Sequence, residues 1–431
     1  MSEQYTPPTA GQRRRLGIPP GSADSLVLSR WAAQARLLVL SESAQAAVRI
    51  AEEVSWFAPE LTVRLFPDWE TLPYDPISPH PDLVSERLET LWQASLGRID
   101  LLVAPAATAT QRLAPPEFLA AHAFLLKLGE RLDVDALRER LIRAGYSHVN
   151  QVLSPGDFAV RGGLIDLYPT GAALPFRIEL LDNEVESLRT FDPDTQRTLY
   201  KVNEIRLLPA REFPLDEAGI TRFRQNFRDR FEGDPSKSRL YKDVSNRLAP
   251  AGIEYYLPLF FAETATLFDY LPQDLTVVLH GDVQRAVEGF WADTRSRHRL
   301  LDSDRDRPLL PPDALFLAPD AFYARIRPYA RIELGGRGEA EAALPFAAPP
   351  EVAANRRAED PYARLKAHLA RFDGATLLVA ESLGRRETMA QALAEYGLKP
   401  ELTEGWSPPR PSPLAPRLSL RRPRASAPEK G

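Results

Sequence analysis

The 431-residue sequence contains no cysteine, which excludes disulfide bonds, thiolate metal sites and cysteine nucleophiles. This absence fits a reducing compartment. The six histidines lie far apart and never form the HExxH spacing of a zinc hydrolase, so we expect no metal site. The sequence also lacks GxSxG, the signature of an α/β-hydrolase serine nucleophile. The sequence therefore offers no hydrolytic site of these familiar kinds.

Long apolar runs are absent as well. None approaches the roughly 18 residues that a membrane-spanning helix needs, and the first residues, MSEQYTPPTAGQRRR, do not resemble a secretory signal. The formal charge of -5 is small for this length and argues against a uniformly basic nucleic-acid binder. A hydrophobic fraction of 44% is enough for real cores. We expect a cytoplasmic protein of about three domains with no membrane partner.

Residues 1–121 alternate helices with short apolar strands, and residues 210–330 return to the same pattern. Alternation of this kind predicts an α/β fold with a parallel sheet covered by helices on both faces. We therefore expect the second stretch to complete the sheet that the first begins. The expected strands are 36–40, 62–66, 101–104 and 275–279.

Residues 122–209 separate these two stretches and have a different pattern. One expected helix, 133–144, is followed by short strands joined by turn signals such as PGD, RGG, YPTG and DNE. Closely spaced strands with tight turns predict an antiparallel sheet, so this stretch is expected to be a small α+β domain inserted into the first. Its expected strands are 158–160, 163–167, 176–181, 185–191 and 201–208.

The remainder divides into three parts. Residues 331–360 are rich in Ala, Pro and Glu and are expected to be a linker. Residues 361–404 hold one strand and two helices, which cannot cover both faces of a sheet, so they are interpreted as the start of a further α/β domain. Residues 405–431 contain seven prolines and five arginines without a hydrophobic period and are expected to be a disordered tail.

Four segments carry a resemblance to a known family: FPDWETLPYD (66–75), GDFAVRGGLIDLYP (156–169), LLPAREF (207–213) and AGIEYYLPLFF (251–261). They resemble the UvrB-homology region of bacterial transcription-repair coupling factors and, more distantly, UvrB itself. The resemblance implies a degenerate P-loop, helicase-like parallel-sheet domain, interrupted by a small antiparallel insertion and followed by a partial α/β domain.

The position that matches the nucleotide loop of this frame is residues 17–25, GIPPGSADS. A working loop needs glycines, a Lys for the outer phosphates and a Ser or Thr for magnesium. Gly17, Gly21 and Ser22 fit, but no Lys is present, and Pro19 and Pro20 remove two backbone N–H donors. No GKS or GKT occurs anywhere in the chain. We expect a non-functional loop, no ATP hydrolysis and no cofactor in this chain.

In the family, the inserted domain docks on UvrA. By match to the family, Arg161, Arg177 and Leu181 are implied to contact UvrA, although the family often has an aromatic residue at the last position. Two arginines on one sheet face would form a cationic docking surface. The alternative is that both arginines pair inside the domain, with Asp166, Glu179 or Asp182.

The full-length family is an ATP-driven double-stranded DNA translocase that displaces stalled RNA polymerase, and its ATP and Mg²⁺ belong to a downstream motor. The resemblance implies that this chain is its N-terminal part, and we favour a truncated or frame-shifted product over a natural short protein. Two alternatives remain open. One is a UvrB-type, ATP-dependent damage-loading subunit; the other is a stand-alone UvrA-binding module.

Overall fold

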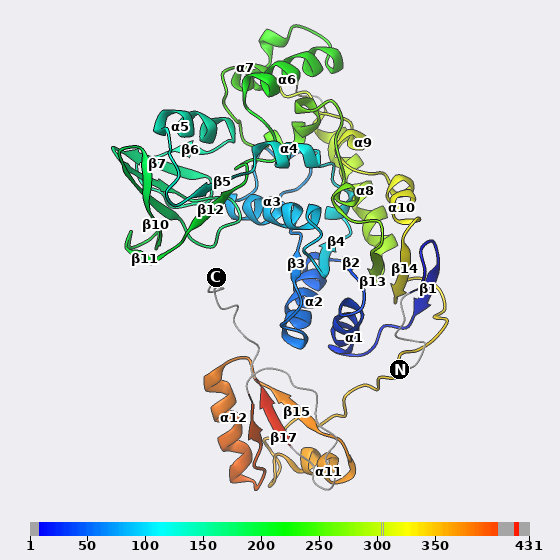
Figure 1. Ribbon diagram of the computed structural model, residues 1–431. Helices are drawn as coiled ribbons and strands as arrows, with labels where there is room; N and C mark the ends of the chain where they lie inside the picture. The colour runs from blue at the N-terminus through cyan, green and yellow to red at the C-terminus, as the bar shows by residue number, and fades with distance from the viewer. Residues whose placement is uncertain (1–7, 303, 305, 404–417, 422–431) are drawn as a thin grey trace.

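The computed structural model describes residues 8–302, 304, 306–403 and 418–421 (Figure 1). Its central element is a six-stranded sheet in the order β1-β14-β13-β2-β4-β3, with every neighbouring pair parallel. β13 lies between β14 and β2, which confirms that the third stretch of the chain completes the sheet begun by the first. The strands are β1 (Arg13–Leu16), β2 (Leu37–Ser41), β3 (Val63–Leu65), β4 (Leu101–Pro105), β13 (Thr276–His280) and β14 (Ala330–Leu334).

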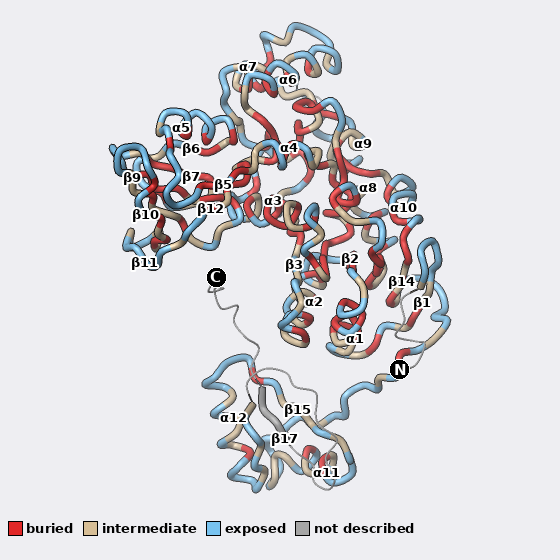
Figure 2. Tube along the Cα trace, viewed as in Figure 1, coloured by how far each residue is buried: buried red, intermediate tan, exposed pale blue. Residues whose placement is uncertain are grey.

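Helices cover both faces of this sheet, as the alternating pattern predicts (Figure 2). On one face lie α1 (Ala23–Ala32) and α2 (Ala44–Phe57), and α2 buries Ala47, Ile50 and Val54 because these residues recur at helical spacing. The other face packs against a larger aromatic core. It includes α3 (Pro81–Ser95), α4 (Pro116–His122), α6 (Glu217–Arg230), α7 (Arg239–Ser245), η4 (Ile253–Phe260), α8 (Val283–Leu301), α9 (Pro312–Leu315) and α10 (Pro319–Ile326).

A buried arginine joins three segments at the centre of this larger core. Arg87, on α3, is fully buried and donates to Glu212 Oε1 at 2.6 Å, to the Pro67 carbonyl at 2.7 Å and to Gln111 Oε1 at 2.8 Å. Its guanidinium lies 4.3 Å from the centre of the Phe66 ring. Arg87 therefore ties the loop after β3 to the segment by which the chain returns from the inserted domain.

The inserted domain is a second six-stranded sheet, in the order β11-β10-β9-β8-β7-β6, packed on α5 (Val134–Arg143). The expectation of a separate, mainly antiparallel sheet is confirmed, with β6–β7 as a parallel pair. The last expected strand, 201–208, is instead divided: its second part pairs with β5 away from the sheet. The strands are β5 (Phe124–Lys127), β6 (Ser147–His148), β7 (Asp157–Arg161), β8 (Leu164–Leu167), β9 (Phe176–Leu181), β10 (Glu184–Phe191), β11 (Thr198–Lys201) and β12 (Glu204–Leu207).

Two expectations about the C-terminal part need correction. β14 crosses the predicted boundary at residue 330, so the sheet domain extends into the predicted linker. Within the predicted disordered tail, residues 418–421 form β17, between β15 and β16 in a three-stranded parallel sheet, and the rest of the tail lies outside the described residues. Elements here are α11 (Ala363–Arg371), β15 (Thr376–Val379), α12 (Leu383–Glu395), β16 (Glu401–Leu402) and β17 (Leu418–Arg421).

Candidate docking surface and degenerate nucleotide loop

The sheet of the inserted domain has one apolar and one polar face. Side chains alternate along each strand, so Ile165, Ile178 and Leu188 meet across β8, β9 and β10 and pack into the core with α5. The register places Asp166 opposite Arg177 on the other face. The residues that the family resemblance implies for docking therefore lie on the polar face.

Asp166 is the centre of this polar face. Its carboxylate is fully buried and accepts hydrogen bonds from Arg161 Nη2 at 2.6 Å and from Arg177 Nε and Nη2 at 2.7 and 3.0 Å. The bidentate bond from Arg177 to Asp166 raises the pKa of that guanidinium. Arg177 also lies 4.8 Å from the centre of the Phe191 ring. One carboxylate thus orients both arginines.

This geometry matches the alternative in which both arginines pair inside the domain, with Asp166 as the partner. The two arginines differ in what they still present to solvent. The Arg177 side chain is 17% exposed, whereas that of Arg161 is 52% exposed. Arg161 is therefore the accessible part of the cluster, and Glu179 adds a second carboxylate whose charge acts on Arg177.

The polar face extends beyond this cluster. Arg189 lies opposite Arg177 and donates to Ser187 Oγ at 3.0 Å, and Lys201 lies opposite Arg189 on β11. Neither forms an ion pair within the described part of the chain. Leu181, at the end of β9, is 59% exposed, so its side chain is available for apolar contact with a partner. The face therefore combines cationic and apolar groups.

The degenerate nucleotide loop joins β1 to α1, so the strand–loop–helix order of a phosphate-binding loop is retained. Gly17 follows β1 and donates its N–H to the Ala342 carbonyl at 3.0 Å. Gly21 has a φ of 61°, a left-handed conformation that favours glycine. Ser22, directly before α1, donates to Glu53 Oε1 at 2.8 Å. The backbone frame persists, while its polar groups are bonded within the protein.

Asp24 lies in the first turn of α1, where a phosphate would approach a working loop. It is 1% exposed and accepts hydrogen bonds from Arg49 Nη2 at 2.6 Å and Nη1 at 3.2 Å, with His280 Nε2 at 2.7 Å. Burial alone would raise the pKa of Asp24, but the bonds from His280 and Arg49 outweigh it and hold the pKa well below its usual range. The protein's own carboxylate occupies this position.

Asp24 lies within the segment GIPPGSADS, but sequence reasoning did not find Arg49 or His280 as its partners. His280 is the last residue of the buried strand β13, and a polar residue directly after the apolar run LTVVL was the available signal. No group of three His, Asp or Glu side chains within residues 8–302, 304, 306–403 and 418–421 is placed to hold a metal ion. Among the described residues, no helix has both the length and the apolar character to cross a membrane.

Comparison with known proteins adds two family matches. The UvrB interaction domain model matches residues 124–213, which is the inserted domain, and the "MFD, D3 domain" model matches residues 368–415. The second match begins within α11 and includes part of the predicted tail.

Full-length relatives agree with these matches. The transcription-repair-coupling factor of Escherichia coli (strain K12) is 40% identical over 411 residues, covering 93% of this chain and 36% of the relative. That of Haemophilus influenzae is 40% identical over 92% of this chain and 35% of the relative, and that of Myxococcus xanthus is 32% identical over 78% and 30%. The chain spans about a third of the length of these relatives. The chain therefore belongs to the transcription-repair-coupling factor family, in which it corresponds to the N-terminal UvrB-homology region.

Proposed function

We propose that this chain binds UvrA through the polar face of its inserted domain, and so brings nucleotide excision repair to RNA polymerase stalled at DNA damage. The observation that carries the proposal is the match of the inserted domain, residues 124–213, to the UvrB interaction domain. The cationic cluster around Asp166 and the exposed Leu181 on the same domain supply the means. Exposed guanidiniums steer an acidic partner and fix its orientation.

In this proposal the three family residues have different roles. Arg161 offers a half-exposed guanidinium to a carboxylate of UvrA. Arg177 donates two hydrogen bonds to Asp166 and so fixes the position of that carboxylate. The carboxylate in turn orients Arg161. Leu181 contributes apolar contact, with less area than an aromatic side chain would give.

Charge reversal at the exposed arginine tests the docking surface. Arg161→Glu is expected to weaken UvrA binding about 10- to 100-fold, because it replaces an attractive pair with a repulsive one at a docking site. Isothermal titration calorimetry with purified UvrA measures the change. Because Arg161→Glu also removes a hydrogen bond to the buried Asp166, thermal unfolding is measured in parallel to confirm that the variant remains folded at the temperature of the titration.

A matched control lies in the same domain. Arg138→Glu makes the same charge change on an exposed position of α5, which packs on the opposite, apolar face of the sheet. UvrA affinity should be nearly unchanged in this variant. Equal losses for Arg138→Glu and Arg161→Glu, or no loss for either, would contradict docking through the polar face. Leu181→Asp provides an independent second position on that face.

We also propose that the chain neither binds ATP at residues 17–25 nor hydrolyses it, and needs no cofactor. The hydrogen bond from Ser22 to Glu53 and the buried Asp24 carboxylate, which is bonded to Arg49, support this proposal. A fluorescent ATP analogue with Mg²⁺ should show no saturable binding that depends on Ser22. Saturable binding abolished by Ser22→Ala would contradict the proposal and favour the UvrB-type, ATP-dependent damage loader instead.

The activities of the whole family are proposed only for the longer protein. There, a motor with ATP and Mg²⁺ would act on double-stranded DNA and RNA polymerase in the cytoplasm, and the present region would add UvrA binding. A stand-alone UvrA-binding module would use the same polar face and respond identically to Arg161→Glu.

A further inference from the structure

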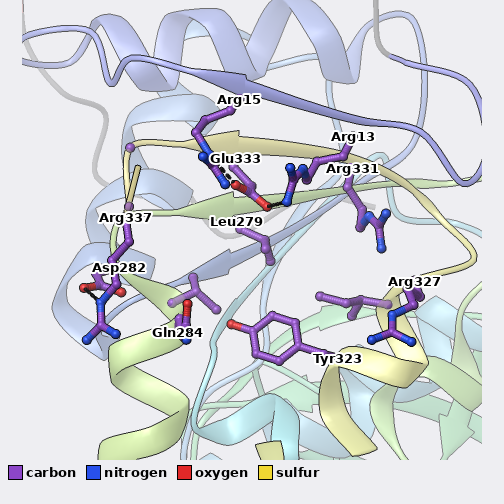
Figure 3. Close-up of a pocket in the computed structure, with 15 residues that line it drawn as sticks. Arg13, Arg15, Leu279, Asp282, Gln284, Tyr323, Arg327, Arg331, Glu333 and Arg337 are labelled. Atoms are coloured by element: carbon purple, nitrogen blue, oxygen red, sulfur yellow. Dashed lines mark hydrogen bonds and ion pairs between the residues drawn. The ribbon is translucent and has the colours of Figure 1, made fainter. Parts of the chain in front are cut away.

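A second cationic region lies on the sheet domain, far in sequence from the docking face. A pocket of about 480 Å³ opens between the strands β1, β13 and β14 and the helices α8 and α10 (Figure 3). Neither the family matches nor the degenerate nucleotide loop accounts for it. Its lining includes five arginines but only two carboxylates: Arg13, Arg15, Arg327, Arg331 and Arg337 against Asp282 and Glu333.

The parallel register explains why these side chains converge. Arg13 lies opposite Arg331, and Arg15 lies opposite Glu333, so alternate residues of β1 and β14 project from the same face of the sheet. Arg327 directly follows α10 and enters from the other side of the pocket (Figure 3). The fold therefore brings positively charged side chains from separate elements into one pocket.

The two carboxylates leave part of this charge uncompensated. Glu333 accepts from Arg15 Nε at 2.8 Å and lies 3.7 Å from Arg13, and Asp282 lies 3.3 Å from Arg337. Arg327 and Arg331 have no carboxylate partner within the described part of the chain. These two guanidiniums thus share one pocket without an ion pair of their own, although the charge of Glu333 also acts on Arg331.

Arg331 is the most informative of the five. Its Nε is buried and has no hydrogen-bond partner among the described residues, and its Nη2 reaches only the Gly11 carbonyl, at 3.4 Å. Burial, with repulsion from Arg13 and Arg327, lowers the pKa of this guanidinium. This Nε is closed to solvent, so an anion in the pocket would act by relieving the repulsion from Arg13 and Arg327.

We propose that this arginine-lined pocket binds phosphate groups. Guanidinium forks match the tetrahedral array of phosphate oxygens and bind it with paired hydrogen bonds. The pocket is open enough to accept a group that remains attached to a larger molecule. A polyphosphate free in solution and the backbone of a nucleic acid offer this same chemistry, and the experiment separates these two sources.

The test titrates the purified chain with pyrophosphate by calorimetry, and with a fluorescent 20-base-pair DNA duplex by anisotropy, both at low salt. At least one probe should bind saturably, and Arg327→Ala/Arg331→Ala should weaken that binding at least tenfold. Higher salt should weaken binding to wild type as well. Binding of pyrophosphate alone assigns the site to a compact polyphosphate; binding of the duplex alone assigns it to a nucleic-acid backbone.

Two further variants distinguish the loss of the binding site from damage to the fold. Arg222→Ala removes an exposed arginine from α6 and should leave the affinity unchanged. Glu333→Gln frees Arg13 and Arg15 from their shared carboxylate and should tighten binding several-fold, whereas damage to the fold would weaken it. Absence of binding to both probes, or equal losses for Arg222→Ala and Arg327→Ala/Arg331→Ala, would overturn the proposal.

Discussion

Replacing Arg87 by alanine is expected to destabilise the chain by about 3–5 kcal/mol, the range for breaking a buried ion pair by removing one partner. The loss arises because Glu212, itself 4% exposed, would keep a buried charge while losing the bond from Arg87 Nε at 2.6 Å. The Pro67 carbonyl and Gln111 would lose their donors as well. Urea unfolding followed by tryptophan fluorescence measures the free energy of unfolding.

An exposed pair provides the matched control. Arg247 also bonds a glutamate, Glu217 Oε2 at 3.1 Å, but the two side chains are 61% and 73% exposed. Arg247→Ala should therefore cost no more than about 1 kcal/mol. The double variant Arg87→Met/Glu212→Met should recover part of the loss of Arg87→Ala, because neither charge is then left unpaired. A loss for Arg87→Ala no larger than that for Arg247→Ala would refute the assigned role.

The layer order of the sheet domain was predictable because its central strands are apolar on both faces. Strands β2, β4 and β13 are buried at every position, and each was expected from a run such as LTVVL. Strands β1 and β14 were missed. Their sequences, RRRL and ARIEL, place arginine and glutamate on the face that lines the arginine pocket. A strand with a charged face at the sheet edge gives no apolar run.

The candidate sites were predictable to the extent that their contacts are local. Arg161 and Asp166 are five residues apart on a hairpin, so sequence reasoning could name the internal pair, whereas the docking role was implied only by the family resemblance. It could not decide how exposed Arg161 would remain. The contact between His280 and Asp24 joins residues 256 positions apart, and only the parallel sheet brings them together.

The tail shows the same limit. Its proline-rich composition favoured disorder, and that composition does not show that residues 418–421 pair with β15 and β16. A four-residue strand between two others needs no hydrophobic period of its own, since its neighbours supply the hydrogen-bond partners. Local composition therefore underestimates order where a short segment takes its hydrogen-bond partners from strands elsewhere in the chain.

Asp24→Ala is expected to destabilise the chain by about 3 kcal/mol at pH 7, because it leaves the buried His280 and the guanidinium of Arg49 without their shared carboxylate. The nearby ionisable groups are Arg49, His280 and Glu53, and Glu53 accepts from Arg49 Nη1 at 2.7 Å. Urea unfolding at a series of pH values measures the difference between wild type and variant. Asp229→Ala, at an exposed position on α6, should change stability by less than about 0.5 kcal/mol.

The sign of the pH dependence follows from the lowered pKa of Asp24. The folded protein binds a proton at this carboxyl more weakly than the unfolded chain does, so acid favours unfolding. The stabilisation should be complete above the ordinary value of 3.8 and should be lost as the pH falls from there through the lower folded pKa. The difference between wild type and Asp24→Ala should thus stay constant from about pH 8 to 5 and shrink below about pH 4. A difference that widens toward acid would show that His280 and Arg49 do not hold the Asp24 carboxylate ionised. The assignment of this carboxylate as the group that fills the phosphate position at residues 17–25 would then be wrong.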